Sequence, residues 1–125
     1  DHRFTFHRKR AHNPERVTLF SIMRDEYYFL PHFLKHYREL GVQHFCIFAD
    51  RCSPDFLERL EAENDVTILL GRDISFGDNF GGQAGDRVVP LPIYLRESVC
   101  PELFPNQWVL FVDSDEFLLL PPPLL

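Results

Sequence analysis

The sequence has few cysteines and no long apolar run. Its three cysteines, Cys46, Cys52 and Cys100, are odd in number and lack C-x-x-C spacing, which indicates neither a disulfide framework nor a zinc site. Free thiols favour a reducing compartment, so we expect a cytoplasmic location. No apolar stretch approaches the roughly 18 residues that a membrane span requires, and no secretory signal opens the chain, so we expect no transmembrane segment here.

Basic residues are scarce beyond the first 16 positions. Residues 1–16 hold five of the 13 Lys and Arg residues and two of the 19 acidic residues, so residues 17–125 carry eight basic and 17 acidic side chains, a balance of −9. Binding to a phosphate backbone requires a basic surface, which argues against nucleic acid as the main partner. We predict that residues 1–16 are a basic, solvated lead-in. Contact with a lipid surface, which would make the protein membrane-associated, and packing against other sequence are the alternatives.

Glycine is scarce as well, and its distribution is uneven. Five of the six glycines lie in residues 71–86. Long loops in compact domains are usually functional lids or disordered segments, so we expect a mobile loop here. The segment has no phosphate-loop pattern, because neither G-x-x-x-x-G-K-S/T nor G-x-G-x-x-G occurs in it.

Length and composition indicate one globular domain. The 125 residues are 45% hydrophobic and include 13 Phe, which is ample material for a core. The chain begins at Asp1 rather than Met and ends in a Pro/Leu tail at residues 121–125, so we expect it to be part of a longer protein. The domain itself is expected to cover residues 17–120.

Four apolar segments predict buried strands, because they are rich in β-branched and aromatic residues. They are Val17–Met23, His44–Ala49, Val66–Leu70 and Trp108–Val112. The last is a continuous apolar run without alternation. Such a run is typical of a strand in the middle of a parallel sheet that is covered on both faces.

Helices are predicted between these strands. Apolar residues recur at helical spacing over residues 29–40, and Gly41 supplies a residue that ends the helix. Ser53-Pro54 is a typical helix start, and a third helix is predicted for Leu91–Val99. Strands that alternate with helices imply parallel pairing, so we predict an α/β fold: a three-layer, Rossmann-like half-domain with a mostly parallel sheet.

The fourth strand runs directly into the acidic residues Asp113, Asp115 and Glu116. In an extended chain, residues two apart point to the same side, so Asp113 and Asp115 should face together while Ser114 faces away. Two carboxylates suit Mg²⁺ or Mn²⁺, and such an ion commonly completes its shell with waters and substrate phosphates. The alternative is an ordinary acidic turn, since Asp and Ser are common turn residues.

Polar residues also follow two of the other strands. Arg24–Glu26 comes after the first strand and Asp50 after the second. Because the carboxyl ends of parallel strands meet at one edge of a sheet, we expect these residues to lie near Asp113 and Asp115. Asp55 has a structural explanation in the first turn of a helix, where the dipole favours an acid, so it ranks below Asp50.

Three stretches of the sequence resemble one known family. They are Met23–Pro31, Phe45–Asp55, which ends in D-x-x-S-x-D, and Trp108–Leu118, which reads WVLFVDSDEFL. They are similar to the strand with its Asn-Glu pair, the second strand and the DxDEF segment of family 2-like glycosyltransferases, which have the GT-A fold. The resemblance covers Val17–Leu120, with Asp25 where that family usually has Asn.

This resemblance implies a metal-dependent, inverting transfer of a sugar from a nucleoside diphosphate-sugar to an unknown acceptor, which is a glycan, a lipid or a protein. In such enzymes the acid after the second strand contacts the base, and the DxD acids hold Mn²⁺ or Mg²⁺ together with the sugar-nucleotide. The nucleotide-binding candidates are therefore Arg24, Asp50 and Asp113, the metal candidates are Asp113 and Asp115, and the further candidates are Glu26, Asp55 and Glu116.

Two other functions are compatible with the motifs. In an aspartate-based phosphotransferase Asp113 would be the nucleophile and Asp115 its acid partner, but only ten residues follow Asp115 and Glu116-Phe117 replaces the usual Gly-Thr pair. The other alternative is a non-catalytic nucleotide-binding or interaction module with an acidic rim. For a transferase we expect the general base to lie outside this chain, so that the chain binds donor without transferring sugar.

Overall fold

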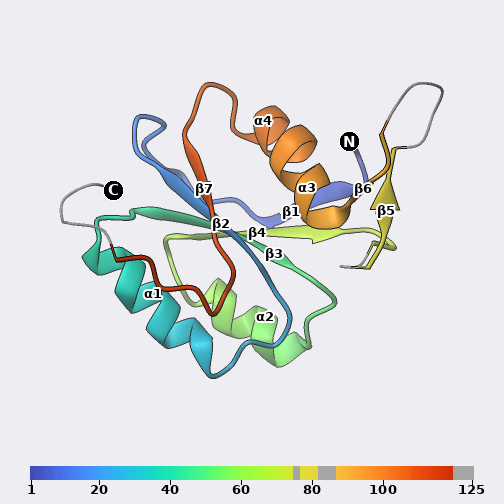
Figure 1. Cartoon of the computed structure of the whole chain (residues 1–125). Coiled ribbons are helices and arrows are strands. Elements are labelled where there is room, and N and C mark those ends of the chain that lie inside the picture. Colours follow the sequence, from blue (N-terminus) through green and yellow to red (C-terminus); the bar gives the residue numbers. More distant parts are fainter. Residues whose placement is uncertain (75–76, 82–86, 120–125) are drawn as a thin grey trace.

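The computed structural model describes residues 1–74, 77–81 and 87–119 and shows a mixed α/β fold around a five-stranded sheet (Figure 1). The strand order is β1-β4-β3-β2-β7. The strands are β1 (Phe4–Arg8), β2 (Thr18–Met23), β3 (His44–Ala49), β4 (Val66–Gly71) and β7 (Val109–Phe111). The four strands from β4 to β7 in this order are parallel to one another, whereas the edge strand β1 runs antiparallel to β4. The predicted α/β class and mostly parallel sheet are confirmed.

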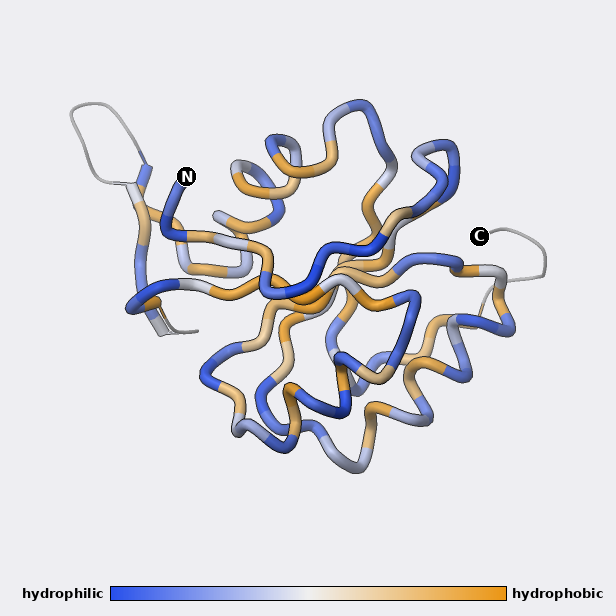
Figure 2. The backbone as a smooth tube through the Cα atoms, turned by 180° about the vertical axis from the view of Figure 1, so that it is seen from behind, coloured by the Kyte–Doolittle hydropathy of each residue, from blue (hydrophilic) through white to orange (hydrophobic). Residues whose placement is uncertain are grey.

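Helices lie on both faces of this sheet (Figure 1). One face is covered by α1 (Phe29–Glu39) and α2 (Pro54–Glu61), and the other by a continuous helical stretch of α3 (Leu91–Tyr94), the π-helical segment η1 (Leu95–Val99) and α4 (Cys100–Leu103). Side chains of β3 alternate between the two cores: Phe45 and Ile47 pack with α1 and α2, while Cys46 and Phe48 pack toward α3 and α4. Figure 2 shows the apolar residues gathered along the central strands.

The predicted first three strands and first two helices are confirmed to within about two residues. Strand β2 begins at Thr18, one residue later than predicted. Gly41 has a φ of 104°, the left-handed conformation that ends α1 without a Cβ clash. The Ser53 hydroxyl accepts a hydrogen bond of 3.2 Å from the Phe56 N–H and so caps α2 as predicted.

The third helical stretch is longer than the prediction, which ended it at Val99. It continues through Pro101 to Leu103. A proline inside a helix has no N–H to donate and its ring crowds the carbonyl four residues earlier. The preceding turn is wide, because the Cys100 N–H donates to the Leu95 carbonyl five residues back, and this π turn makes room for the proline.

Residues 1–16 contain a strand, so the prediction of a wholly solvated lead-in is wrong. Strand β1 pairs with β4 at the edge of the sheet, and Phe4 is only 5% exposed. The sequence signal is weak because the strand alternates an apolar residue with polar ones that face solvent. Its apolar contribution rests on Phe4 and Phe6.

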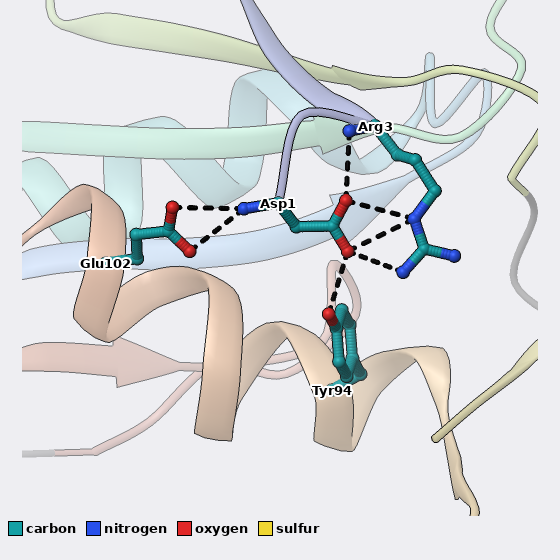
Figure 3. Close-up of polar contacts among 4 residues, drawn as sticks. All are labelled: Asp1, Arg3, Tyr94 and Glu102. Atoms are coloured by element: carbon teal, nitrogen blue, oxygen red, sulfur yellow. Dashed lines mark hydrogen bonds and ion pairs between the residues drawn. The ribbon is translucent and has the colours of Figure 1, made fainter. Parts of the chain in front are cut away.

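The residues at the start of β1 contact the helical stretch of α3 and α4 (Figure 3). The Asp1 carboxylate accepts hydrogen bonds from the Arg3 side chain and, at 2.8 Å, from the Tyr94 hydroxyl. The Asp1 backbone nitrogen lies 3.0 Å from both carboxylate oxygens of Glu102. These contacts tie the first residues of the chain to α3 and α4.

Strand β7 lies at an edge of the sheet, and not in its middle as predicted. It has three residues, all partly exposed, and the preceding Trp108 is 82% exposed. In the part of the chain that the structure describes, the apolar run therefore has a neighbouring strand on one side only. That neighbour is β2, with Phe20 opposite Phe111.

A separate antiparallel pair, β5 (Asn79–Phe80) with β6 (Val89–Pro90), lies within and just after the predicted mobile loop of residues 71–86. Residues 75–76 and 82–86 of that loop fall outside the described residues, as do residues 120–125, which include the predicted Pro/Leu tail. Among the helices that the structure describes, none is both long and apolar enough to cross a membrane.

Candidate functional site

The sheet reverses its direction of growth between β2 and β7. From β2 the chain passes through α1 on one face to β3, whereas β7 lies on the other side of β2 and is reached through α3 and α4 on the opposite face. In open parallel sheets this reversal leaves a crevice at the carboxyl ends of the strands, where ligands bind. Three groups of candidate residues lie at this edge: Arg24–Glu26 follows β2, Asp50 follows β3, and Asp113–Glu116 follows β7.

Two hollows open at this edge. The first, called the Asp50 hollow, has a volume of about 440 Å³. It is lined by Ile22, Arg24, Glu26, Asp50, Arg51 and Gly77. The structure thus brings together three of the candidates named from the sequence and adds the guanidinium of Arg51, which the sequence analysis did not single out.

The Asp50 side chain is buried in the wall of this hollow, with 3% of the residue exposed. Its backbone N–H donates to the Met23 carbonyl at 2.9 Å, which extends the pairing of β3 with β2. Its carboxylate oxygen Oδ1 receives no hydrogen bond from the described residues, and Arg51 Nε lies 3.5 Å away. A buried carboxylate oxygen without a donor is unfavourable, so Asp50 offers an acceptor to a ligand in the hollow.

Asp25 and Asp55 have local structural roles. The Asp25 carboxylate accepts a hydrogen bond of 2.8 Å from the Ser53 N–H, which joins the loop after β2 to the start of α2. Asp25 has a φ of 52°, a left-handed conformation that Asp and Asn adopt more readily than most residues. Asp55 is exposed in the first turn of α2 and lines neither hollow at this edge.

The acidic residues after β7 form a turn and not the extended segment that the sequence predicted. The Glu116 N–H donates to the Asp113 carbonyl at 3.0 Å, and the Asp113 N–H donates to Glu116 Oε1 at 2.6 Å. Asp113 and Asp115 are nevertheless exposed while Ser114 is 8% exposed, so the expected separation of acids from serine is found. The turn itself agrees with the alternative interpretation of this segment.

Negative charge accumulates in this turn. The pKa of Asp113 is raised by burial first, and then by the neighbouring charges of Glu116 and Asp115. A divalent cation would offset this repulsion, and carboxylate oxygens are the ligands that Mg²⁺ and Mn²⁺ prefer. Within the described residues no three His, Cys, Asp or Glu side chains form a ready metal cluster. An ion held by one or two of these carboxylates would therefore need water or ligand oxygens to complete its shell.

The second hollow, called the Asp113 hollow, has a volume of about 210 Å³. It is lined by Ile22, Pro92, Arg96, Phe111, Val112, Asp113 and Glu116. Ile22 lines both hollows, so they adjoin at the end of β2. Arg96 comes from η1, and nothing in the local sequence pattern distinguished it from other exposed helical residues.

Helix α1 holds the acidic turn in place. The Tyr37 hydroxyl donates to the Glu116 carbonyl at 2.8 Å and accepts from the Leu118 N–H at 3.2 Å. His36 Nε2 lies 2.7 Å from the Leu118 carbonyl oxygen, which it meets as a donor. Burial raises the pKa of Tyr37, and the Glu116 charge raises it further, so its phenol remains protonated and able to donate.

Comparisons with protein-family models, with curated proteins and with solved structures gave no match for this chain. The functional assignment therefore rests on the motifs of the sequence and on the geometry of this edge of the sheet. The described geometry supplies two adjoining hollows, one with a buried carboxylate oxygen that receives no hydrogen bond and one with an acidic turn.

Proposed function

We propose that this chain binds a nucleoside diphosphate-sugar as the donor-binding part of a metal-dependent, family 2-like glycosyltransferase, with a three-layer, Rossmann-like GT-A half-domain. The reaction class is inverting transfer to a glycan, lipid or protein acceptor. The observation that carries the proposal is the buried Asp50 Oδ1, which receives no hydrogen bond from the described residues and lies in a hollow that shares Ile22 with the hollow of Asp113. A ligand with a hydrogen-bond donor at one end and a diphosphate at the other fits this pair of hollows.

The nucleoside end is assigned to the Asp50 hollow. A carboxylate accepts hydrogen bonds from a ring N–H or from ribose hydroxyls, and such a donor would satisfy the orphaned oxygen. Arg24 and Arg51 line the same hollow and offer positive charge toward the adjoining phosphates. Glu26 is a second acceptor there.

The diphosphate end is assigned to the Asp113 hollow. Asp113 and Asp115 would hold Mn²⁺ or Mg²⁺, with Glu116 fixing the turn through its hydrogen bond to the Asp113 N–H. When bound, the ion supplies Lewis-acid stabilisation of the charge on the departing diphosphate. The carboxylates bind and orient, and they need no role as acid or base.

A thermal-shift screen tests this proposal. The chain is heated with UDP, GDP, ADP or CDP and with the corresponding diphosphate-sugars, each with Mn²⁺ or with EDTA. A ligand at 100 times its dissociation constant adds about 2.7 kcal/mol to the free energy of unfolding, so a specific nucleotide produces a clear rise in melting temperature. We expect stabilisation by at least one diphosphate in Mn²⁺ and much less in EDTA.

The same screen separates the alternative functions. Equal stabilisation in Mn²⁺ and EDTA would leave a nucleotide-binding module without a metal site. Stabilisation by phosphate mimics such as beryllium fluoride, with none by nucleotides, would favour phosphotransferase chemistry at Asp113. No response to any nucleotide would contradict the proposal.

A further inference from the structure

The helical stretch across the Asp113 hollow contains a π turn at the point where it faces the acidic residues. Leu95 and Val99 are buried, and the three residues between them, Arg96, Glu97 and Ser98, are exposed. The Cys100 N–H donates to the Leu95 carbonyl, so the turn is wider than an α-helical one. Such π turns occur frequently at functional sites, where they redirect a side chain.

Arg96 lies between two depressions of the surface. It lines the Asp113 hollow together with Asp113 and Glu116, and it also lines a neighbouring hollow of about 280 Å³ beside Trp108. The Arg96 side chain is 57% exposed. It is the cation in the lining of the Asp113 hollow, whose other charged residues are the two acids.

The guanidinium of Arg96 is only loosely held. Within the described residues, its ion pair is with the adjacent Glu97 at 3.8 Å, beyond hydrogen-bond distance. Glu97 in turn accepts a hydrogen bond of 3.2 Å from Arg87. The donors of Arg96 are thus available to a ligand, while the acid next to it already has a partner.

We propose that Arg96 binds the phosphate oxygens of the ligand in the Asp113 hollow, which it lines together with Asp113 and Glu116. This inference rests on the proposed function and adds a residue to that site. One divalent ion does not balance three carboxylates and a diphosphate, and Arg24 and Arg51 line the adjoining Asp50 hollow, so a cation within the Asp113 hollow itself would further offset the charge of the phosphates. Arginine suits this position because its planar fork donates two parallel hydrogen bonds to phosphate oxygens.

A simpler role for Arg96 is that of a counter-ion to Asp113 and Glu116 in the absence of ligand. The two roles predict opposite effects on metal-dependent binding of phosphate. A counter-ion competes with a metal cation for the carboxylates. Its removal should therefore tighten binding of the metal alone, and metal-dependent binding of phosphate should be at least as strong as in the wild-type chain. Removal of a phosphate-binding residue should instead weaken the binding of phosphate in the presence of the metal.

The test compares Arg96→Gln with the wild-type chain and with Arg87→Gln. The control removes the other arginine that contacts Glu97 but does not line the Asp113 hollow. Binding of Mn²⁺ alone is measured by electron paramagnetic resonance. Binding of inorganic pyrophosphate in Mn²⁺, and of the nucleoside diphosphate selected by the thermal-shift screen, is measured by isothermal titration calorimetry.

We expect Arg96→Gln to weaken Mn²⁺-dependent binding of pyrophosphate and of the diphosphate by about 10-fold to 100-fold, the range for a charged hydrogen-bonded contact. Affinity for Mn²⁺ alone and for the corresponding nucleoside should be unchanged or higher, and Arg87→Gln should behave as wild type. Arg96→Lys should fall between, because it keeps the charge without the fork.

Wild-type affinity for pyrophosphate in Arg96→Gln would overturn this inference and leave the proposed function intact. An equal loss of Mn²⁺, nucleoside and pyrophosphate binding would also overturn it, since that pattern indicates damage to the fold. If the wild-type chain binds no nucleotide and no pyrophosphate in Mn²⁺, the proposed function fails and this inference fails with it.

Discussion

The Tyr37 hydroxyl donates a hydrogen bond of 2.8 Å to the carbonyl oxygen of Glu116 and thereby connects helix α1 to the acidic turn after β7. The two residues are 79 positions apart in the sequence. Tyr37 has no exposed surface, so this bond is made from inside the core. The position of the turn is therefore set by the packing of α1 as well as by the short strand before it.

Tyr37→Phe keeps the ring and removes both hydrogen bonds of the hydroxyl. We expect a loss of about 1–2 kcal/mol in the free energy of unfolding, measured by urea titration, because the Glu116 carbonyl and the Leu118 N–H lose their partner. Metal-dependent nucleotide binding should weaken several-fold. Tyr28→Phe, at a tyrosine that is 74% exposed, is the control and should change neither quantity. An unaltered nucleotide affinity in Tyr37→Phe would show that the turn needs no support from α1.

Asp113→Asn should separate stability from ligand binding. Because the folded protein raises the pKa of Asp113, ionisation of this group destabilises the fold, and stability falls as pH rises from below 3.8 through the raised pKa. Removing the charge should leave the melting temperature of the ligand-free chain unchanged or slightly higher at pH 7. Mn²⁺-dependent nucleotide binding should be lost, whereas Glu58→Gln on the exposed face of α2 should have no effect. A large drop in the ligand-free melting temperature would contradict the assigned role.

Asp50→Ala should discriminate between the two ends of the ligand. If Asp50 accepts from the base or ribose, the variant binds a nucleoside diphosphate at least tenfold more weakly and binds pyrophosphate as wild type does. The stability of the ligand-free chain should change little, because the substitution removes a buried oxygen without a hydrogen bond and, with it, a 3.5 Å ion pair to the exposed Arg51. Calorimetry with both ligands measures the difference, and an equal loss for both would exclude a nucleoside contact.

His44 should make the fold acid-sensitive. Burial, together with the charge of the stacked His12, lowers the pKa of His44 to about 4, while Asp65 acts in the opposite direction. The unfolded chain, with a pKa near 6.5, binds the proton more tightly, so stability is lost as pH falls from 6.5 toward 4. This group alone should cost about 2 kcal/mol between pH 7 and pH 5.

Urea titrations of wild type and His44→Gln at pH 7 and pH 5 measure that cost. The variant loses the hydrogen bonds that His44 makes to Thr18 and Thr67, so it should be less stable at both pH values, but its stability should fall less between them. His32→Gln, at an exposed position of α1, should keep the wild-type pH dependence. The same slope in His44→Gln and wild type would show that other groups cause the acid sensitivity.

The central elements could be predicted because their signals are local. Runs such as Phe45–Ala49 are apolar since both faces of β3 are covered. Ser53 and Gly41 mark the start of α2 and the end of α1, through a side-chain cap and a left-handed backbone conformation. Strand β1 was missed because an edge strand with one buried face leaves a weak alternating pattern. The helix through Pro101 was cut short because a proline normally ends a helix.

The candidate site was predictable as a set of residues but not as a geometry. Asp50 and Asp113 follow apolar strands, and parallel pairing places both at one edge. That the acids lie on a turn depends on the reciprocal hydrogen bonds of Asp113 and Glu116, which no periodicity reveals. The position of Arg96 in the hollow depends on a π turn, and the support that Tyr37 gives to the acidic turn is a contact distant in sequence. Neither role could be predicted from the spacing of residues.

Ile22 lines both hollows, and the spacing of the strands on either side of it determines how far apart the two hollows lie. Asp50 and Asp113 follow β3 and β7, the two strands that flank β2, and these strands are two strand spacings, about 10 Å, apart. Under the proposed function, a nucleoside alone would occupy one hollow, and a ligand would gain the contacts of both only when its phosphate chain is long enough to pass over Ile22. Such a site would select ligands by the length of their phosphate chain. Affinity should increase sharply for the ligand whose chain is just long enough to contact the acidic turn.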